Sequence, residues 1–159
     1  EKFRKKVSLL RAGTEDAERL HAMQKKAFQE LLDKYQDYET NPASEAAEKV
    51  FMRLKQEFTY YYFICFEGRK VGAVRVVDKK EPGKNKRISP IFILPEFQGR
   101  GIAQEAIRLC EEIHGCGQWE LDTILQEEKN CYLYEKMGYR RTDKTRKVND
   151  RLTLVFYEK

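Results

Sequence analysis

The hydrophobic positions change their spacing several times along the chain, and each change marks an expected element. From residue 14 to residue 31, apolar side chains recur at helical spacing, at Ala17, Leu20, Met23, Ala27, Phe28 and Leu31. That spacing places them on one face of a helix. From residue 60 to residue 77 the chain is rich in β-branched and aromatic residues, interrupted by Glu67-Gly68-Arg69. This pattern is typical of two strands joined by a tight hairpin.

The whole chain, treated in the same way, predicts the order β-α-α-β-β-β-α-β-α-β-β. Strands are expected over 7–10, 60–66, 70–77, 87–94 and 119–125, and in two segments after Gly138. Helices are expected to follow Thr14 as an N-cap, to begin at Asn41-Pro42, and to cover 102–113 and 130–137. Pro90 cannot donate a hydrogen bond to a sheet, so it predicts a bulge or a locally unpaired edge. The expected fold is α/β (α+β), a sheet with helices on its faces, in one domain over 1–159.

Composition and charge narrow the classes of protein. The 159 residues include 31 basic and 26 acidic side chains, which gives a net charge of +5. The basic runs are short and scattered, which disfavours a nucleic-acid-binding domain in which glycines such as Gly99 and Gly101 would have no role in binding. The apolar runs are of strand length, and no charged-then-apolar leader precedes a cleavage site. We therefore expect a cytoplasmic protein with neither a nucleic acid nor a membrane as partner.

The four cysteines fit reduced thiols in such a protein. Cys110, His114 and Cys116 lie close together in the sequence, which suggests zinc, but their spacing matches no standard pattern of paired ligands. A nucleophilic pair of Cys131 with His114 can also be imagined, although each residue falls inside a pattern typical of the core. We expect no metal and no cysteine acyl-enzyme.

The stretch 98–103 is unusual because two glycines, Gly99 and Gly101, stand at the start of the expected helix 102–113. Glycine is a poor helix former, so it needs a reason there. One interpretation is a helix cap in a flexible turn. The other is an anion that approaches the first helical amides, which have no partners within the helix and carry the positive end of its dipole.

The sequence from Gln98 to Ala103, with Pro95-Glu96-Phe97 before it and "YEKMGY" at 134–139 after it, resembles the GCN5-related N-acetyltransferase (GNAT) family. The resemblance covers essentially the whole chain. It implies the GNAT fold, a mixed and mostly antiparallel sheet of about seven strands with four helices. It also implies that acetyl-CoA is the co-substrate and that an amine is the acceptor. The cofactor-binding residues that it implies are Ile91, Phe92, Ile93, Gln98, Gly99, Arg100, Gly101, Ile102, Ala103, Gln104 and Asn130.

The resemblance also suggests catalytic residues. Tyr134 occupies the family's tyrosine position and is expected to protonate the departing thiolate. Asp122, twelve residues earlier, matches a glutamate that acts as base in the ribosomal-protein acetyltransferase branch, and Glu120 shares its side of the strand by alternation. Where that branch has an asparagine, this chain has Glu127, with Asn130 displaced by three positions.

The acceptor side in this fold is formed by the first two helices, their connection and the final hairpin. These regions and the following strand carry aromatic residues and two carboxylates, which suit either a cationic amine or a core: Phe28, Tyr35, Tyr38, Phe58, Tyr60 to Tyr62, Glu39 and Glu57. The expected function is N-acetyl transfer from acetyl-CoA to a primary amine of a small molecule or peptide. The alternative is a non-catalytic acetyl-CoA sensor or interaction domain, and a homodimer is left open.

Overall fold

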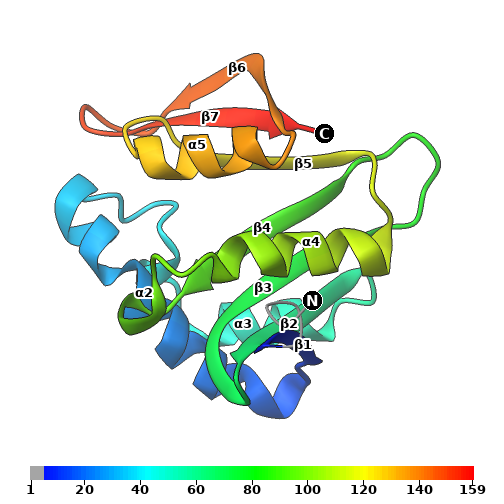
Figure 1. Cartoon of the computed structure of the whole chain (residues 1–159). Coiled ribbons are helices and arrows are strands. Elements are labelled where there is room, and N and C mark those ends of the chain that lie inside the picture. Colours follow the sequence, from blue (N-terminus) through cyan, green and yellow to red (C-terminus); the bar gives the residue numbers. More distant parts are fainter. Residues whose placement is uncertain (1–5) are drawn as a thin grey trace.

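The computed structural model describes residues 6–159 and is shown in Figure 1. Within these residues, the helices are α2 (Ala17–Tyr35), α3 (Ala47–Lys55), α4 (Ile102–His114) and α5 (Glu128–Lys136). The strands are β1 (Val7–Arg11), β2 (Thr59–Phe66), β3 (Arg69–Val77), β4 (Lys86–Ile93), β5 (Trp119–Ile124), β6 (Arg140–Lys147) and β7 (Thr153–Glu158). Short 3-10 turns cover Thr14–Asp16, Pro42–Ser44 and Pro95–Phe97. The predicted order of strands and helices is confirmed.

All described strands belong to one sheet, in the spatial order β1-β2-β3-β4-β5-β7-β6. Neighbouring strands are antiparallel except β4 and β5, which are parallel. This parallel pair is held only at Lys86 opposite Trp119 and Arg87 opposite Glu120. Beyond these two positions the strands diverge, as Figure 1 shows between β4 and the layer of β5, β7 and β6. The divergence leaves an opening in the middle of the sheet.

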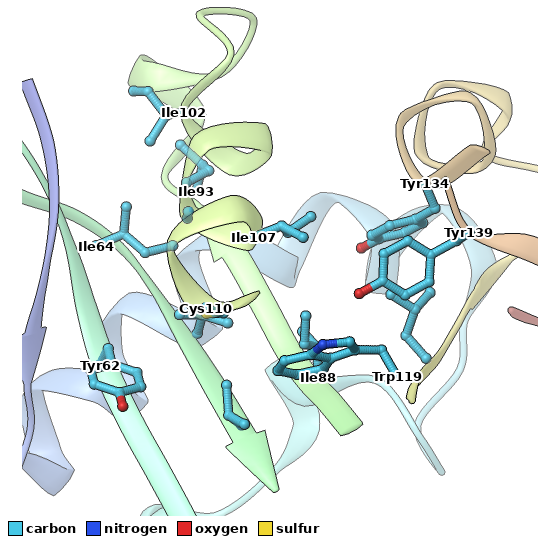
Figure 2. Close-up of a cluster of buried hydrophobic side chains, with 14 of the residues drawn as sticks. Tyr62, Ile64, Ile88, Ile93, Ile102, Ile107, Cys110, Trp119, Tyr134 and Tyr139 are labelled. Atoms are coloured by element: carbon cyan, nitrogen blue, oxygen red, sulfur yellow. The ribbon is translucent and has the colours of Figure 1, made fainter. Parts of the chain in front are cut away.

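Two apolar clusters cover the two faces of the sheet. On one face, α4 and α5 pack over a cluster that includes Ile107, Trp119 and Tyr139 (Figure 2). On the other face, α2 and α3 cover a second cluster, in which Phe63 and Phe92 are buried. Within residues 6–159, no helix is both long and apolar enough to cross a membrane.

Three local predictions have different outcomes. The prediction that Thr14 caps the first helix is wrong, because Gly13 is the N-cap of a 3-10 turn and its amide donates to the Asp16 carboxylate at 2.9 Å. Asn41 does cap a turn, accepting from the Ala43 amide at 2.7 Å, but the regular helix α3 begins only at Ala47. The bulge predicted at Pro90 is confirmed, because the register of β3 with β4 shifts beside it.

Candidate active site

A cleft of about 310 Å³ occupies the opening between β4 and β5, and we call it the β4–β5 cleft. Segments far apart in the sequence form it, because the two strands part at the centre of the sheet and α2, α5 and the final hairpin close around them. Its walls comprise Phe28, Leu31, Asp37, Thr40, Asn41, Pro42, Arg87, Ile88, Ser89, Pro90, Ile91, Asp122, Thr123, Ile124, Asn130, Tyr134, Arg146 and Leu154.

The glycine loop leads into α4 in a conformation that only glycine adopts without strain. Gly99 and Gly101 have φ of +78° and +76°, in the left-handed region. Nothing lies within 4 Å of where a Cβ on Gly99 would stand, so the loop surface there is open. In the described part of the chain, the amides of residues 99–104 donate to no backbone or side-chain acceptor. The loop therefore offers unpaired donors at a helix N-terminus, which fits a diphosphate.

Neighbouring side chains fix this loop. The Gln98 amide group donates to the Ile93 carbonyl at 2.9 Å, which ties the loop to the end of β4. The guanidinium of Arg100 lies over the Phe97 ring, 5.8 Å from its centroid, at the rim. Ile102 is buried in the core, so only its backbone can face a ligand, whereas Ala103 and Gln104 are half-buried in the first turn.

The free edge of β4 continues the path from the loop toward the cleft. The Leu94 amide donates to the Val71 carbonyl of β3, so by alternation the backbone groups of Ile93 and Ile91 face the opening. Phe92, by the same alternation, turns its backbone toward β3, and its ring packs on Phe28 of α2. Of the three positions predicted to bind a pantetheine arm, Ile91 therefore offers both of its backbone groups, and Ile93 offers its amide, because the Ile93 carbonyl accepts from Gln98.

Tyr134 of α5 lies where the cleft meets the core. It is 7% exposed and lines the cleft, and its ring contacts those of Tyr139 and Tyr157. Figure 2 shows the Tyr134 and Tyr139 rings side by side, with their hydroxyl groups directed toward α4. Burial raises the pKa of Tyr134, and the charge of Asp122 raises this pKa further. Because this pKa is raised, the hydroxyl keeps its proton at neutral pH, and no hydrogen bond to another side chain among residues 6–159 occupies it.

Asp122 and Glu120 of β5 point to the same side of the sheet, as alternation predicts, and both are half-buried. The guanidinium of Arg87 bridges them, contacting the Asp122 carboxylate and lying 3.4 Å from that of Glu120. Asp122 lines the cleft with Tyr134, whereas Glu120 lies outside its walls. The geometry thus favours Asp122 as the carboxylate that reaches a ligand.

The sequence reasoning missed three charged residues of the cleft walls, Arg87, Asp37 and Arg146, and of these Arg87 contacts the carboxylates of β5. It stands at the last position where β4 pairs with β5, so its side chain lies beside both carboxylates of β5. The only signal in the sequence was a basic residue at the start of an expected strand. Its partners depend on the parallel pairing of β4 with β5, which could not be derived from local patterns.

Of the residues predicted for the acceptor side, one lines the β4–β5 cleft and the others lie elsewhere. Phe28 lines the cleft, and Leu31 beside it was not predicted. Tyr35 donates to the Glu127 carboxylate, which also accepts from Lys34 at 2.8 Å and so joins α2 to the start of α5. The remaining aromatic and acidic positions lie outside the walls of the cleft: Tyr38, Glu39, Glu57, Phe58, Tyr60, Tyr61 and Tyr62. Asn130 does line the cleft, through the first turn of α5.

The cysteine and zinc hypotheses find no matching geometry. Burial raises the pKa of the Cys110 thiol to about 12, and Cys131 directs its sulfur toward the Ile124 carbonyl at 3.8 Å. His114 instead contacts Asp78 and Tyr62. Over residues 6–159, no three His, Cys, Asp or Glu side chains are grouped so that they could hold a metal ion.

A family comparison agrees with this geometry, since residues 19–139 match the model of the acetyltransferase (GNAT) family. The chain belongs to the GNAT family. Among solved structures, a spermidine N-acetyltransferase from Vibrio cholerae, in complex with CoA and spermine, is 16% identical with a TM-score of 0.74 over 96% of this chain and 94% of that one. An acetyltransferase from Thermus thermophilus is 16% identical, with a TM-score of 0.70 over 95% and 94% of the two chains.

A third solved structure is the ribosomal-protein-S18-alanine N-acetyltransferase from Escherichia coli. It is 12% identical, with a TM-score of 0.71 over 95% of this chain and 91% of that one. At such identities the structures establish the shared GNAT fold. No curated protein sequence matches the chain.

Proposed function

We propose that this GNAT protein transfers an acetyl group from acetyl-CoA to a primary amine of a small molecule or peptide by direct attack. The observation that supports this most is that Asp122 and Tyr134, a carboxylate and an uncharged hydroxyl, line the same cleft in the opening between β4 and β5. The names of two structural relatives, which refer to spermidine and to a protein alanine, point to the same kind of acceptor.

The cofactor would lie along a continuous surface. The unpaired amides of the Gly99–Ala103 loop suit the diphosphate, and the Ile93 amide with the backbone groups of Ile91 suits the amide groups of the arm. Bound acetyl-CoA supplies the thioester whose carbonyl carbon the amine attacks. The loop, β4 and the cleft follow one another in space, so the thioester end would reach the region of Tyr134.

Two proton transfers have to be provided. An alkyl ammonium of pKa about 10.4 must lose a proton before it can attack, and Asp122 is the carboxylate placed to accept it, directly or through water. The Arg87 guanidinium already contacts the Asp122 carboxylate in this structure, so an entering amine would share that carboxylate with Arg87. Tyr134 keeps its proton at neutral pH and would donate it to the departing sulfur.

A panel of amines tests the proposal. The purified protein, acetyl-CoA and one candidate at a time (spermidine, free amino acids, peptides with different N-terminal residues) are incubated, and thiol release is measured while mass spectrometry identifies an acetylated product. We expect at least one amine to raise thiol release above the hydrolysis measured without acceptor. Binding of acetyl-CoA without transfer to any amine would favour the sensor alternative.

A further inference from the structure

A second cavity lies at the other end of α4 from the glycine loop. It has a volume of about 750 Å³ and is bounded by the last turn of α4, the beginning of β2 and the connection between β3 and β4. It shares no residue with the β4–β5 cleft. We call it the basic pocket, after the four cationic residues in its walls, Arg11, Lys80, Lys84 and Lys86.

The charge of the basic pocket is only partly balanced. Of its two carboxylates, that of Glu81 pairs with Lys84 at 3.8 Å. That of Asp78 lies 3.4 Å from Nδ1 of His114 and also accepts from the Lys80 amide at 3.0 Å. Within residues 6–159, no carboxylate forms an ion pair with Arg11, Lys80 or Lys86, although the charge of Asp78 attracts the Lys80 ammonium. The walls thus carry four cations against two carboxylates, and this excess of positive charge attracts anions.

Aromatic rings hold these cations in place. The Arg11 guanidinium and the Lys80 ammonium both lie over the Tyr60 ring, 4.7 Å and 5.5 Å from its centroid. The Lys86 ammonium lies 5.0 Å from the centroid of the buried Trp119 ring and donates to the Gly117 carbonyl at 2.7 Å. Cation–π contacts of this kind fix the positions of the charges without neutralising them.

The buried side chain of His114 lies at the floor of the pocket, beside the Asp78 carboxylate. His114 contacts the Tyr62 hydroxyl at 2.9 Å through Nε2, and its side chain is 6% exposed. Burial lowers the pKa of His114, so the ring is neutral at pH 7. Two wall residues, Lys80 and Gln118, have φ of +55° and +62°, a conformation that costs a non-glycine residue about 1 kcal/mol or more.

We propose that the basic pocket is a second ligand site, which binds a small organic phosphate. Three cations that form no ion pair with a carboxylate match the several charged oxygens of a phosphate or diphosphate better than the single charge of a carboxylate. The volume exceeds that of an inorganic phosphate and leaves room for an organic group against Tyr60 and Ile113. This inference is independent of the proposed acetyl transfer.

The test has to separate the basic pocket from the glycine loop, which is also suited to a diphosphate. Amide chemical shifts of the ¹⁵N-labelled protein are recorded during titrations with inorganic pyrophosphate and with ADP. We expect a set of shifts at residues 78–86 and 113–118, separate from any set at residues 99–104. Tighter binding of ADP than of pyrophosphate at the first set means that the organic group contributes to binding.

Two variants with a matched control decide the outcome. The single variant Lys80→Gln and the double variant Lys80→Gln/Lys86→Gln should weaken binding at residues 78–86 by about tenfold for each charged contact that is lost. Neither variant should change the ligand-induced amide shifts at residues 99–104. The control replaces Lys25 and Lys136, exposed lysines outside both cavities, by Gln. The proposal is overturned if residues 78–86 do not respond to either probe, or if the control weakens binding as much as the pocket variants do.

Discussion

Removing the hydroxyl of Tyr134 separates a catalytic role from a packing role. Tyr134→Phe keeps the ring that contacts Tyr139 and Tyr157 and deletes an oxygen that has no hydrogen-bond partner among residues 6–159. No intramolecular hydrogen bond is lost, so the free energy of unfolding should change by no more than about 0.5 kcal/mol. General acid catalysis contributes about 10²- to 10⁴-fold, so the rate of acetyl transfer should fall by that factor, or by about 2.7 to 5.4 kcal/mol in activation free energy.

Tyr139→Phe is the matched control. Tyr139 is equally buried and contacts Tyr134, but its hydroxyl donates to Glu111 at 3.3 Å and does not line the cleft. This change should lower the free energy of unfolding by about 1 to 3 kcal/mol, because it removes a hydrogen bond from a buried carboxylate, and it should leave the rate nearly unchanged.

Both variants are measured by urea unfolding and by single-turnover transfer with acetyl-CoA, so that product release does not mask the chemical step. If Tyr134→Phe transfers acetyl as fast as the wild type, Tyr134 is a packing residue and the assignment of the acid is refuted. An equal loss of rate in both variants would instead mean that the packing of the tyrosine cluster, and not the hydroxyl, supports activity.

Three further predictions concern the base, the buried histidine and one glycine. Asp122→Asn should slow transfer most at low pH, where free amine is scarce, and the loss of rate should shrink toward pH 9. The assignment of Asp122 as base would be contradicted by an equal loss of rate at every pH, or by a pH-dependent loss in Glu120→Gln alone. Burial lowers the pKa of His114, so the unfolded chain binds its proton more tightly, and stability should fall as the pH drops below about 6.5. His114→Gln should lessen that fall in urea unfolding between pH 7.5 and 5.5, and an unchanged fall would assign it to other groups. In Gly72→Ala a Cβ would stand 2.2 Å from a backbone carbonyl oxygen of β4, so the melting temperature should drop by several degrees. An unchanged melting temperature would show that β3 and β4 can move apart at no cost in stability.

Much of the fold follows from local patterns in the sequence. The spacing of Ala17, Leu20 and Met23 predicted α2, and the run around Glu67-Gly68-Arg69 predicted the β2–β3 hairpin, because periodicity depends only on which face a segment buries. Pro90 predicted the irregularity of β4 for a similarly local reason, its missing amide. The N-terminus of α2 was misplaced because the Asp16 carboxylate, and not the Thr14 hydroxyl, bonds a free amide there.

The candidate site could be predicted only in part. The glycine loop and Tyr134 were identified through the resemblance to the GNAT family, and the alternation of β5 placed Asp122 and Glu120 on one side. The bridge from Arg87 could not be predicted, because it depends on a parallel pairing between segments more than thirty residues apart. The resemblance suggested Tyr60 and Tyr62 as residues of the acceptor side, with the core as the alternative, whereas in the structure both line the basic pocket.

The binding of acetyl-CoA at the glycine loop is the central claim, and a thermal-unfolding titration tests it most directly. The wild type should be stabilised progressively by acetyl-CoA, by about 1.4 kcal/mol for each tenfold rise in concentration above the Kd. Gly101→Val should lose this stabilisation, whereas Gly68→Val, which introduces the same side chain at a similar φ of +82° in the β2–β3 hairpin, should keep it. No shift of the wild type at millimolar acetyl-CoA, or an undiminished shift in folded Gly101→Val, would contradict the account.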